Sequence, residues 1–87
     1  MTEEEYVSAL LAFVRREFLS DSDDVELTAA TPLIESGVLD SLRIAVLMAF
    51  IRDEFAVQVP LTKIDARHFA DISTIAAMLH EEQGVRA

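Results

Sequence analysis

Residues 33–42 read Leu33-Ile34-Glu35-Ser36-Gly37-Val38-Leu39-Asp40-Ser41-Leu42 and lie between two segments with the apolar spacing of helices. Gly37 can take a positive φ that a residue with a Cβ would resist, so the chain is expected to turn there. Asp40 is a good N-cap, because its side chain can accept from the free backbone N–H groups of a helix that begins after it. Ser41 is therefore predicted at the first helical position, exposed at a helix N-terminus, with Leu42 and the apolar run behind it anchoring the helix.

A serine hydroxyl in this place has one clear chemical use, which is to carry a phosphate ester. The N-terminus of a helix offers unpaired N–H groups and about half a positive charge, and both favour a phosphate there. A serine modified in this way is a tether point and not a catalyst.

Gly37-Val38-Leu39-Asp40-Ser41-Leu42 resembles the Gly-x-x-Asp-Ser-Leu motif of the acyl carrier proteins, and in particular the free-standing and D-alanyl carriers that work with adenylating ligases. The resemblance implies that a phosphopantetheinyl transferase, using coenzyme A and magnesium, attaches a 4'-phosphopantetheine arm to Ser41. The terminal thiol of the arm would hold an acyl or aminoacyl cargo as a thioester. Asp40 would cap the helix and help the transferase recognise the motif, and Leu42 would belong to the same attachment site.

The implied function is that of a carrier that performs no chemistry itself. An adenylating acyl or aminoacyl ligase, or a synthase or transferase module, would load or receive the cargo, and the carrier would raise its effective concentration at each partner. The resemblance extends along the chain. Thr31-Pro32-Leu33-Ile34-Glu35-Ser36-Gly37 resembles the segment before the family's serine, and Phe69-Ala70-Asp71-Ile72-Ser73-Thr74-Ile75 resembles its Phe-x-x-Ile-x-x-Ile signature.

Apolar periodicity and capping residues predict an all-α fold, an antiparallel four-helix bundle with three main helices and one short helix, built from residues 1–87 as a single domain. Thr2 and Glu5 form a capping box before the first helix, expected from Glu3 to Phe18. The other helices are expected over residues 41–55, as a short helix within residues 61–69 with 65–69 favoured, and from after Asp71 to about residue 83, with Gly84 as the C-cap of the last.

The composition excludes several classes of protein. With 52% hydrophobic residues, two glycines and two prolines, the 87-residue chain favours a small helical fold, and without cysteine it can form neither disulfides nor thiolate metal sites. The formal charge of −9 argues against nucleic acid as a partner. Glu3, Glu4 and Glu5 argue against a signal peptide, and no apolar run is long enough to span a membrane, so a cytoplasmic monomer is expected.

The segment from Leu19 to Asp40 is predicted to be a long connection that delivers the motif. Its aspartates at positions 21, 23 and 24 suggest a calcium loop, but counting from Asp21 the sixth position is Glu26 instead of glycine and the twelfth is Pro32 instead of glutamate. Calcium binding is therefore rejected. Four apolar side chains are expected to hold the connection against the bundle: Val25, Leu27, Leu33 and Ile34.

The helix expected after Asp40 is apolar on almost every side, so it either leaves apolar surface exposed for a partner or lies at the centre of the bundle. Five residues are assigned to partner binding: Val38, Leu39, Arg43, Val46 and Ile64. Val38, Leu39 and Leu42 would form an apolar contact surface, and Ile64 would line a cargo cleft. Arg43 departs from fatty-acid carriers, whose matching helix usually begins with acidic residues, so it favours dedicated partners with a more apolar or acidic docking surface. It could also neutralise the attached phosphate.

Two alternatives compete with carriage. A hydrolase with Ser41 as nucleophile needs a base, a supporting acid and an oxyanion hole, but His68 and His80 have no motif context. An unmodified acidic helical adaptor would fit the composition equally well, and only the motif argues against it. The cargo stays open between fatty acyl, polyketide, amino acid and D-alanine, although the absence of the Gly-Gly-x-Ser typical of peptidyl carriers favours an acyl or D-alanyl type.

Overall fold

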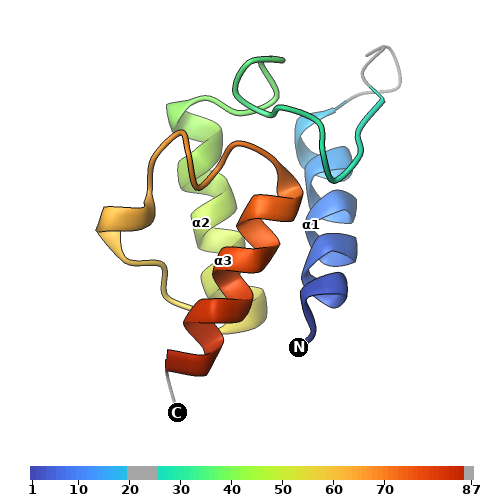
Figure 1. Cartoon of the computed structure of the whole chain (residues 1–87). Helices are drawn as coiled ribbons and strands as arrows, with labels where there is room; N and C mark the ends of the chain where they lie inside the picture. Colours follow the sequence, from blue (N-terminus) through green and yellow to red (C-terminus); the bar gives the residue numbers. More distant parts are fainter. Residues whose placement is uncertain (20–25, 86–87) are drawn as a thin grey trace.

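The computed structural model of the protein describes residues 1–19 and 26–85. They form α1 (Glu3–Phe18), α2 (Ser41–Phe55), the short 3-10 helix η1 (Leu61–Lys63) and α3 (Ile72–Val85). α1 runs from the end that holds the N-terminus to the opposite end, and α2 and α3 both run back, so that α1 is antiparallel to each of them (Figure 1). Residues 26–40 cross the far end of the bundle, which is where α2 begins (Figure 1).

The predicted all-α bundle is confirmed, since the described residues form helices and turns without any strand. Asp21, Asp23, Asp24 and Val25, which entered the calcium-loop hypothesis and the anchoring prediction, lie outside the described residues. None of the helices in the described ranges has both the length and the apolar character needed to cross a bilayer.

The starts of the three α-helices agree with the sequence analysis because each depends on a local side-chain cap. The backbone N–H of Glu5 donates to Thr2 Oγ1 at 3.1 Å, while Glu5 Oε1 accepts from the backbone of Thr2 at 2.8 Å, which completes the capping box. Asp71 caps α3 by accepting from the backbone N–H of Thr74 at 2.7 Å. The end of α3 differs from the prediction, since the helix continues through Gly84 to Val85.

The short helix lies within the predicted span 61–69, but at its start, Leu61–Lys63, instead of at the favoured residues 65–69. Pro60, with φ −62°, leads directly into it. Residues 65–69 close a single turn, in which the N–H of Phe69 donates to the carbonyl of Asp65 at 3.1 Å. Just after this turn, the carbonyl of Ala70 accepts from the backbone N–H of Leu33 at 2.8 Å and so joins the connection to the bundle.

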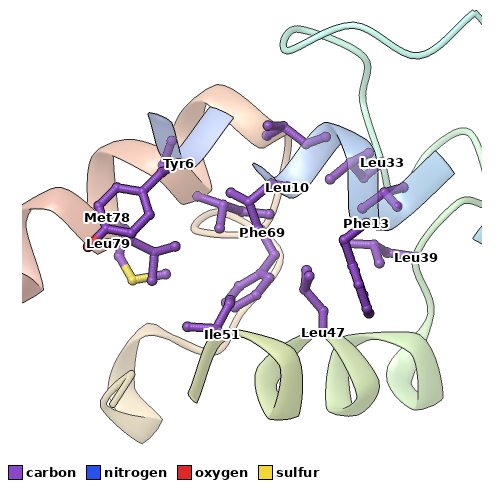
Figure 2. Packing of buried hydrophobic residues seen from close by; sticks show 14 of the residues in the cluster. Tyr6, Leu10, Phe13, Leu33, Leu39, Leu47, Ile51, Phe69, Met78 and Leu79 are labelled. Atoms are coloured by element: carbon purple, nitrogen blue, oxygen red, sulfur yellow. The ribbon is translucent and has the colours of Figure 1, made fainter. Parts of the chain in front are cut away.

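Aromatic side chains join α1 to α2. The rings of Phe13 and Phe50 stack with centroids 3.9 Å apart, and Tyr6 meets Phe55 edge-on at 5.0 Å. The hydroxyl of Tyr6 also donates to Oε1 of Gln83 on α3, so this side chain contacts both neighbouring helices. Burial raises the pKa of the Tyr6 hydroxyl. Figure 2 shows the apolar cluster that these helices enclose, with the side chains of Leu47 and Ile51 directed from α2 into it.

The connection contributes to the core at several points. Leu27, Leu33, Val38 and Leu39 are buried, whereas Ile34 is 36% exposed, so the prediction that Ile34 anchors the connection is wrong. Two of these residues pair with each other, since the N–H of Leu39 donates to the carbonyl of Leu33 at 3.0 Å. Ile34 points outward from the turn that this pairing closes, and Gly37 completes the turn with the predicted positive φ of 82°.

Candidate functional site

Ser41 is the first residue of α2 and is exposed at the end of the bundle away from the chain N-terminus. Asp40 precedes it in an extended conformation, and its Oδ1 accepts from the backbone N–H of Arg43 at 2.8 Å. The carbonyl of Asp40 accepts the first helical hydrogen bond, from Ile44, at 2.8 Å. The predicted cap is therefore confirmed, and Ser41 lies exposed at the capped start of the helix.

Val38 and Leu39 do not form the exposed contact surface that was predicted. Each is only 2% exposed and belongs to the apolar cluster. The reason is that these two side chains fasten the connection to the bundle immediately before α2. Because the anchor lies directly before the cap, Asp40 and Ser41 are held at the surface in a fixed position.

Arg43 lies in the first turn of α2 with its side chain half-buried. Its Nη1 donates to the carbonyl of Val38 at 3.1 Å, and its guanidinium carbon lies 5.5 Å from the centre of the Phe18 ring at the end of α1. The guanidinium is thus directed toward the connection and α1. Arg43 is the only charged residue in α2 before Arg52, so the exposed surface behind Ser41 is uncharged for almost three turns.

That surface is apolar, as one of the two open alternatives expected. Leu42 is 74% exposed and Val46 is 42% exposed, while Leu47 and Ile51 on the same helix are fully buried. α2 therefore presents apolar side chains both to the core and to solvent.

A groove with a volume of about 980 Å³ opens beside Ser41 and continues along α2. The helix wall is formed by Ile44, Ala45, Met48, Ala49 and Arg52, which repeat at the helical spacing that places them on the same face as Ser41. The opposite wall is the segment from Val57 to Leu61 together with Ile64, which lies on the cleft as predicted. The lining is mainly apolar, with Arg52 and Gln58 as polar members remote from Ser41 in sequence.

An ion pair fixes the wall of the groove that contains η1. Nζ of Lys63 lies 2.5 Å from Oε1 of Glu82 and 3.6 Å from Glu81, both on α3. The hydrogen bond to Glu82 is the main reason that the pKa of Lys63 is raised. The pair therefore ties η1 to α3.

The histidines lie apart from the serine. The ring of His68 and its backbone N–H both lie 2.8 Å from Oδ1 of Asp65, and the backbone hydrogen bond is the main cause of the lowered pKa of Asp65. His80 is exposed on α3. Among the described residues no hydrogen bond joins Ser41 to either histidine, and no cluster of three or more metal-ligating side chains occurs.

Ala49, Arg52 and Leu61 also line the groove, although they were not among the residues predicted for the site. The spacing of Ala49 and Arg52 from Ser41, eight and eleven residues, is a signal that could have placed them on the serine's face of α2. No comparable signal exists for Leu61, because its position depends on how the segment after α2 folds back.

The exposed serine at a capped helix start and the apolar groove beside it are features of a carrier that holds a prosthetic arm. The family described as "Phosphopantetheine attachment site" matches residues 9–81, which include Ser41 and all of α2. The chain therefore belongs to the acyl carrier protein family, and it carries groups on a covalently attached 4'-phosphopantetheine arm. Both the resemblance and the cofactor expected from the motif are confirmed.

Two relatives show the extent of the similarity. The chain is 32% identical over 82 residues to the "Probable acyl carrier protein PigG" of Serratia sp. (strain ATCC 39006), a match that covers 88% of this chain and 93% of that protein. It is also similar to a chain in a solved structure described as "Crystal structure of FAD-dependent dehydrogenase", with a TM-score of 0.73 and 34% identity, over 80% of this chain and 97% of that one. Acyl carrier proteins work with partner enzymes.

Proposed function

We propose that Ser41 is the residue to which the arm is attached, and that the protein presents a thioester-bound acyl or aminoacyl group to its partner enzymes without catalysing a reaction. The observation that carries the proposal is the position of the Ser41 hydroxyl, which is exposed at the first residue of α2 and opens onto the groove. Ser36 is the nearest other serine, but its hydroxyl donates to the carbonyl of Leu33 at 3.3 Å within the turn.

The residues around Ser41 suit a phosphodiester that leads into an apolar chain. The backbone N–H groups of the first turn of α2 and the partial positive charge of the helix favour the phosphate at this end. Ile44, Ala45 and Met48 offer apolar surface immediately along the groove. When bound, the arm supplies a thiol that holds the cargo as a thioester, and the groove walls can shield the apolar part of arm or cargo from water.

The partners proposed from the family are a phosphopantetheinyl transferase and an adenylating ligase or a synthase or transferase module. The similarity to a chain from the crystal structure of an FAD-dependent dehydrogenase adds such an enzyme as a candidate, acting on the cargo while the carrier holds it. This can be measured directly. A loaded carrier incubated with such an enzyme should lose two hydrogens from the cargo in an intact-mass spectrum, and an unchanged mass would remove the dehydrogenase from the set of partners.

The attachment is tested by intact mass after incubation with coenzyme A, magnesium and a phosphopantetheinyl transferase of broad specificity. The wild type should gain one phosphopantetheine, and Ser41→Ala should gain none while keeping the helical circular dichroism of the wild type. Ser8→Ala is the matched control, because Ser8 is exposed on α1. It should be modified at the wild-type rate.

Two results would contradict the proposal. Modification of Ser41→Ala would place the arm on another residue. Failure of the folded wild type to accept any arm would favour the unmodified adaptor. In that case the exposed apolar face of α2 would be the first surface to examine for binding.

A further inference from the structure

The side chain of Arg43 connects three parts of the fold that meet at the site. Arg43 itself belongs to α2, its Nη1 donates to the carbonyl of Val38 in the connection, and its guanidinium lies over the ring of Phe18 at the end of α1. A cation in the first turn of a helix is unfavourably placed relative to the helix dipole, and α2 has no acidic residue in that turn. Any stabilisation by the Arg43 side chain therefore has to come from its contacts outside α2.

Arg43 contacts the chain at two points directly before the serine, one through its backbone and one through its side chain. Its backbone N–H donates to Oδ1 of Asp40 at 2.8 Å, and its side chain holds the carbonyl of Val38 at 3.1 Å. The two contacts span residues 38–40, which end at the exposed cap Asp40 and lead directly into Ser41. Ordering such a segment costs conformational entropy, so a loop that is already ordered can bind a partner without losing that freedom during the encounter.

We propose that Arg43 is a positioning residue for the transfer of the arm onto Ser41. It acts by holding residues 38–41 in the conformation that the transferase recognises. The proposal rests on Ser41 being the attachment residue. It assigns to Arg43 a role different from that of a docking cation, because the guanidinium is directed toward the Val38 carbonyl and the Phe18 ring instead of toward solvent.

Substitution by lysine separates the two roles. Lysine keeps the positive charge that a docking surface would need, but it lacks the planar fork that can donate to a carbonyl while lying over an aromatic ring. A positioning residue should therefore not be replaceable by lysine. In a variant, only a fraction of the molecules would have residues 38–41 in the conformation that the transferase recognises, and the apparent affinity of the transferase for the carrier would fall by that fraction. KM should therefore rise while kcat stays close to the wild-type value.

The experiment measures steady-state kinetics of arm transfer from coenzyme A onto the full-length wild type and four variants, together with hydrogen exchange of residues 33–41. Arg43→Met and Arg43→Lys should each lower kcat/KM on the order of tenfold, through KM, and should speed exchange in this segment. Phe18→Leu, which removes only the aromatic partner, should have a smaller effect in the same direction, about threefold. Arg16→Met is the control, since Arg16 is exposed and lies over the Phe13 ring at 5.7 Å. It should stay within about twofold of the wild type.

Wild-type kinetics for Arg43→Lys would overturn the proposal in favour of a docking charge, as would normal exchange of residues 33–41 in both Arg43 variants. If Arg43→Met does not fold, the lysine and Phe18 variants carry the test alone. A wild type that is never modified would refute the attachment at Ser41, whereas the exchange measurement would still decide whether Arg43 orders the loop.

Discussion

Replacing Asp40 by alanine should destabilise the protein by an amount that can be worked out from its two interactions. The side chain accepts one hydrogen bond from the backbone of Arg43, and losing such a cap costs about 1 kcal/mol. The carboxylate also lies at the positive end of α2, which contributes about 0.3–1 kcal/mol. Asp40→Ala should therefore lower the free energy of unfolding by about 1.3–2 kcal/mol, and the melting temperature by about 5–15 °C for a chain of this size.

Asp40→Asn separates the two contributions, because asparagine keeps a side-chain oxygen that can accept the same hydrogen bond. It should cost only the charge contribution, about 0.3–1 kcal/mol. Both variants remove one negative charge from a chain with a formal charge of −9, so relief of repulsion is the same in each. The difference between the two variants therefore reports the hydrogen bond alone.

Urea denaturation at neutral pH, at low and at high salt, provides the measurement. Salt screens the interaction of the carboxylate with the helix, so the deficit of the asparagine variant should shrink, while the alanine variant should keep a deficit of about 1 kcal/mol. Equal stability of the two variants would refute the reasoning, because it would mean that the hydrogen bond to Arg43 does not hold the first turn of α2.

Three further predictions concern single positions. Leu47→Ala should lower the free energy of unfolding, measured by urea denaturation, by about 2–5 kcal/mol, because Leu47 is fully buried. Leu42→Ala should change it by no more than about 0.5 kcal/mol, because Leu42 is exposed. Equal losses in the two variants would contradict the assigned faces of α2. Gly37→Ala should lower the free energy of unfolding by about 1 kcal/mol in the same assay, because alanine is strained at the φ of 82°. A steric clash should not contribute, since an added Cβ would have no atom within 4 Å. An unchanged stability would mean that the turn relaxes. The hydrogen bond from the backbone of Thr2 lowers the pKa of the Glu5 carboxyl below its ordinary value of 4.5. The stabilisation by this carboxylate should therefore be complete above pH 4.5 and be lost as the pH falls through the lowered pKa. Melting curves should show a weaker loss of stability in acid for Glu5→Gln than for the wild type, and an equal loss would contradict the prediction.

How much of the fold the sequence predicts depends on how local the signal is. Thr2, Asp40 and Asp71 each act on a backbone group three residues away, so the starts of α1, α2 and α3 could be read directly from the chain. The end of α3 is less well predicted, because a C-cap glycine is a preference of one residue and not a specific side-chain hydrogen bond. The helix continues through Gly84.

The site was harder to predict where burial depends on distant parts of the chain. Val38 and Leu39 were assigned to the surface because they are apolar and adjacent to the serine. They are buried because the connection folds back onto itself, through the bond from Leu39 to the carbonyl of Leu33, and onto the bundle through Ala70. A tertiary pairing of this kind leaves no pattern in the residues that it buries.

The apolar character of α2 on every side follows from three different environments, which resolves the choice left open by the sequence. Leu47 and Ile51 contact the core, and the residues that follow Ser41 at helical spacing line the groove. Leu42 and Val46 form a third, solvent-exposed face. A helix that only stabilised the bundle would need just the first of these faces. The second and third faces leave apolar surface in contact with water, which is energetically unfavourable. The groove face lies on the same side of α2 as Ser41, and Leu42 and Val46 lie in the first two turns after it. The apolar composition of α2 is therefore not accounted for by packing of the bundle alone.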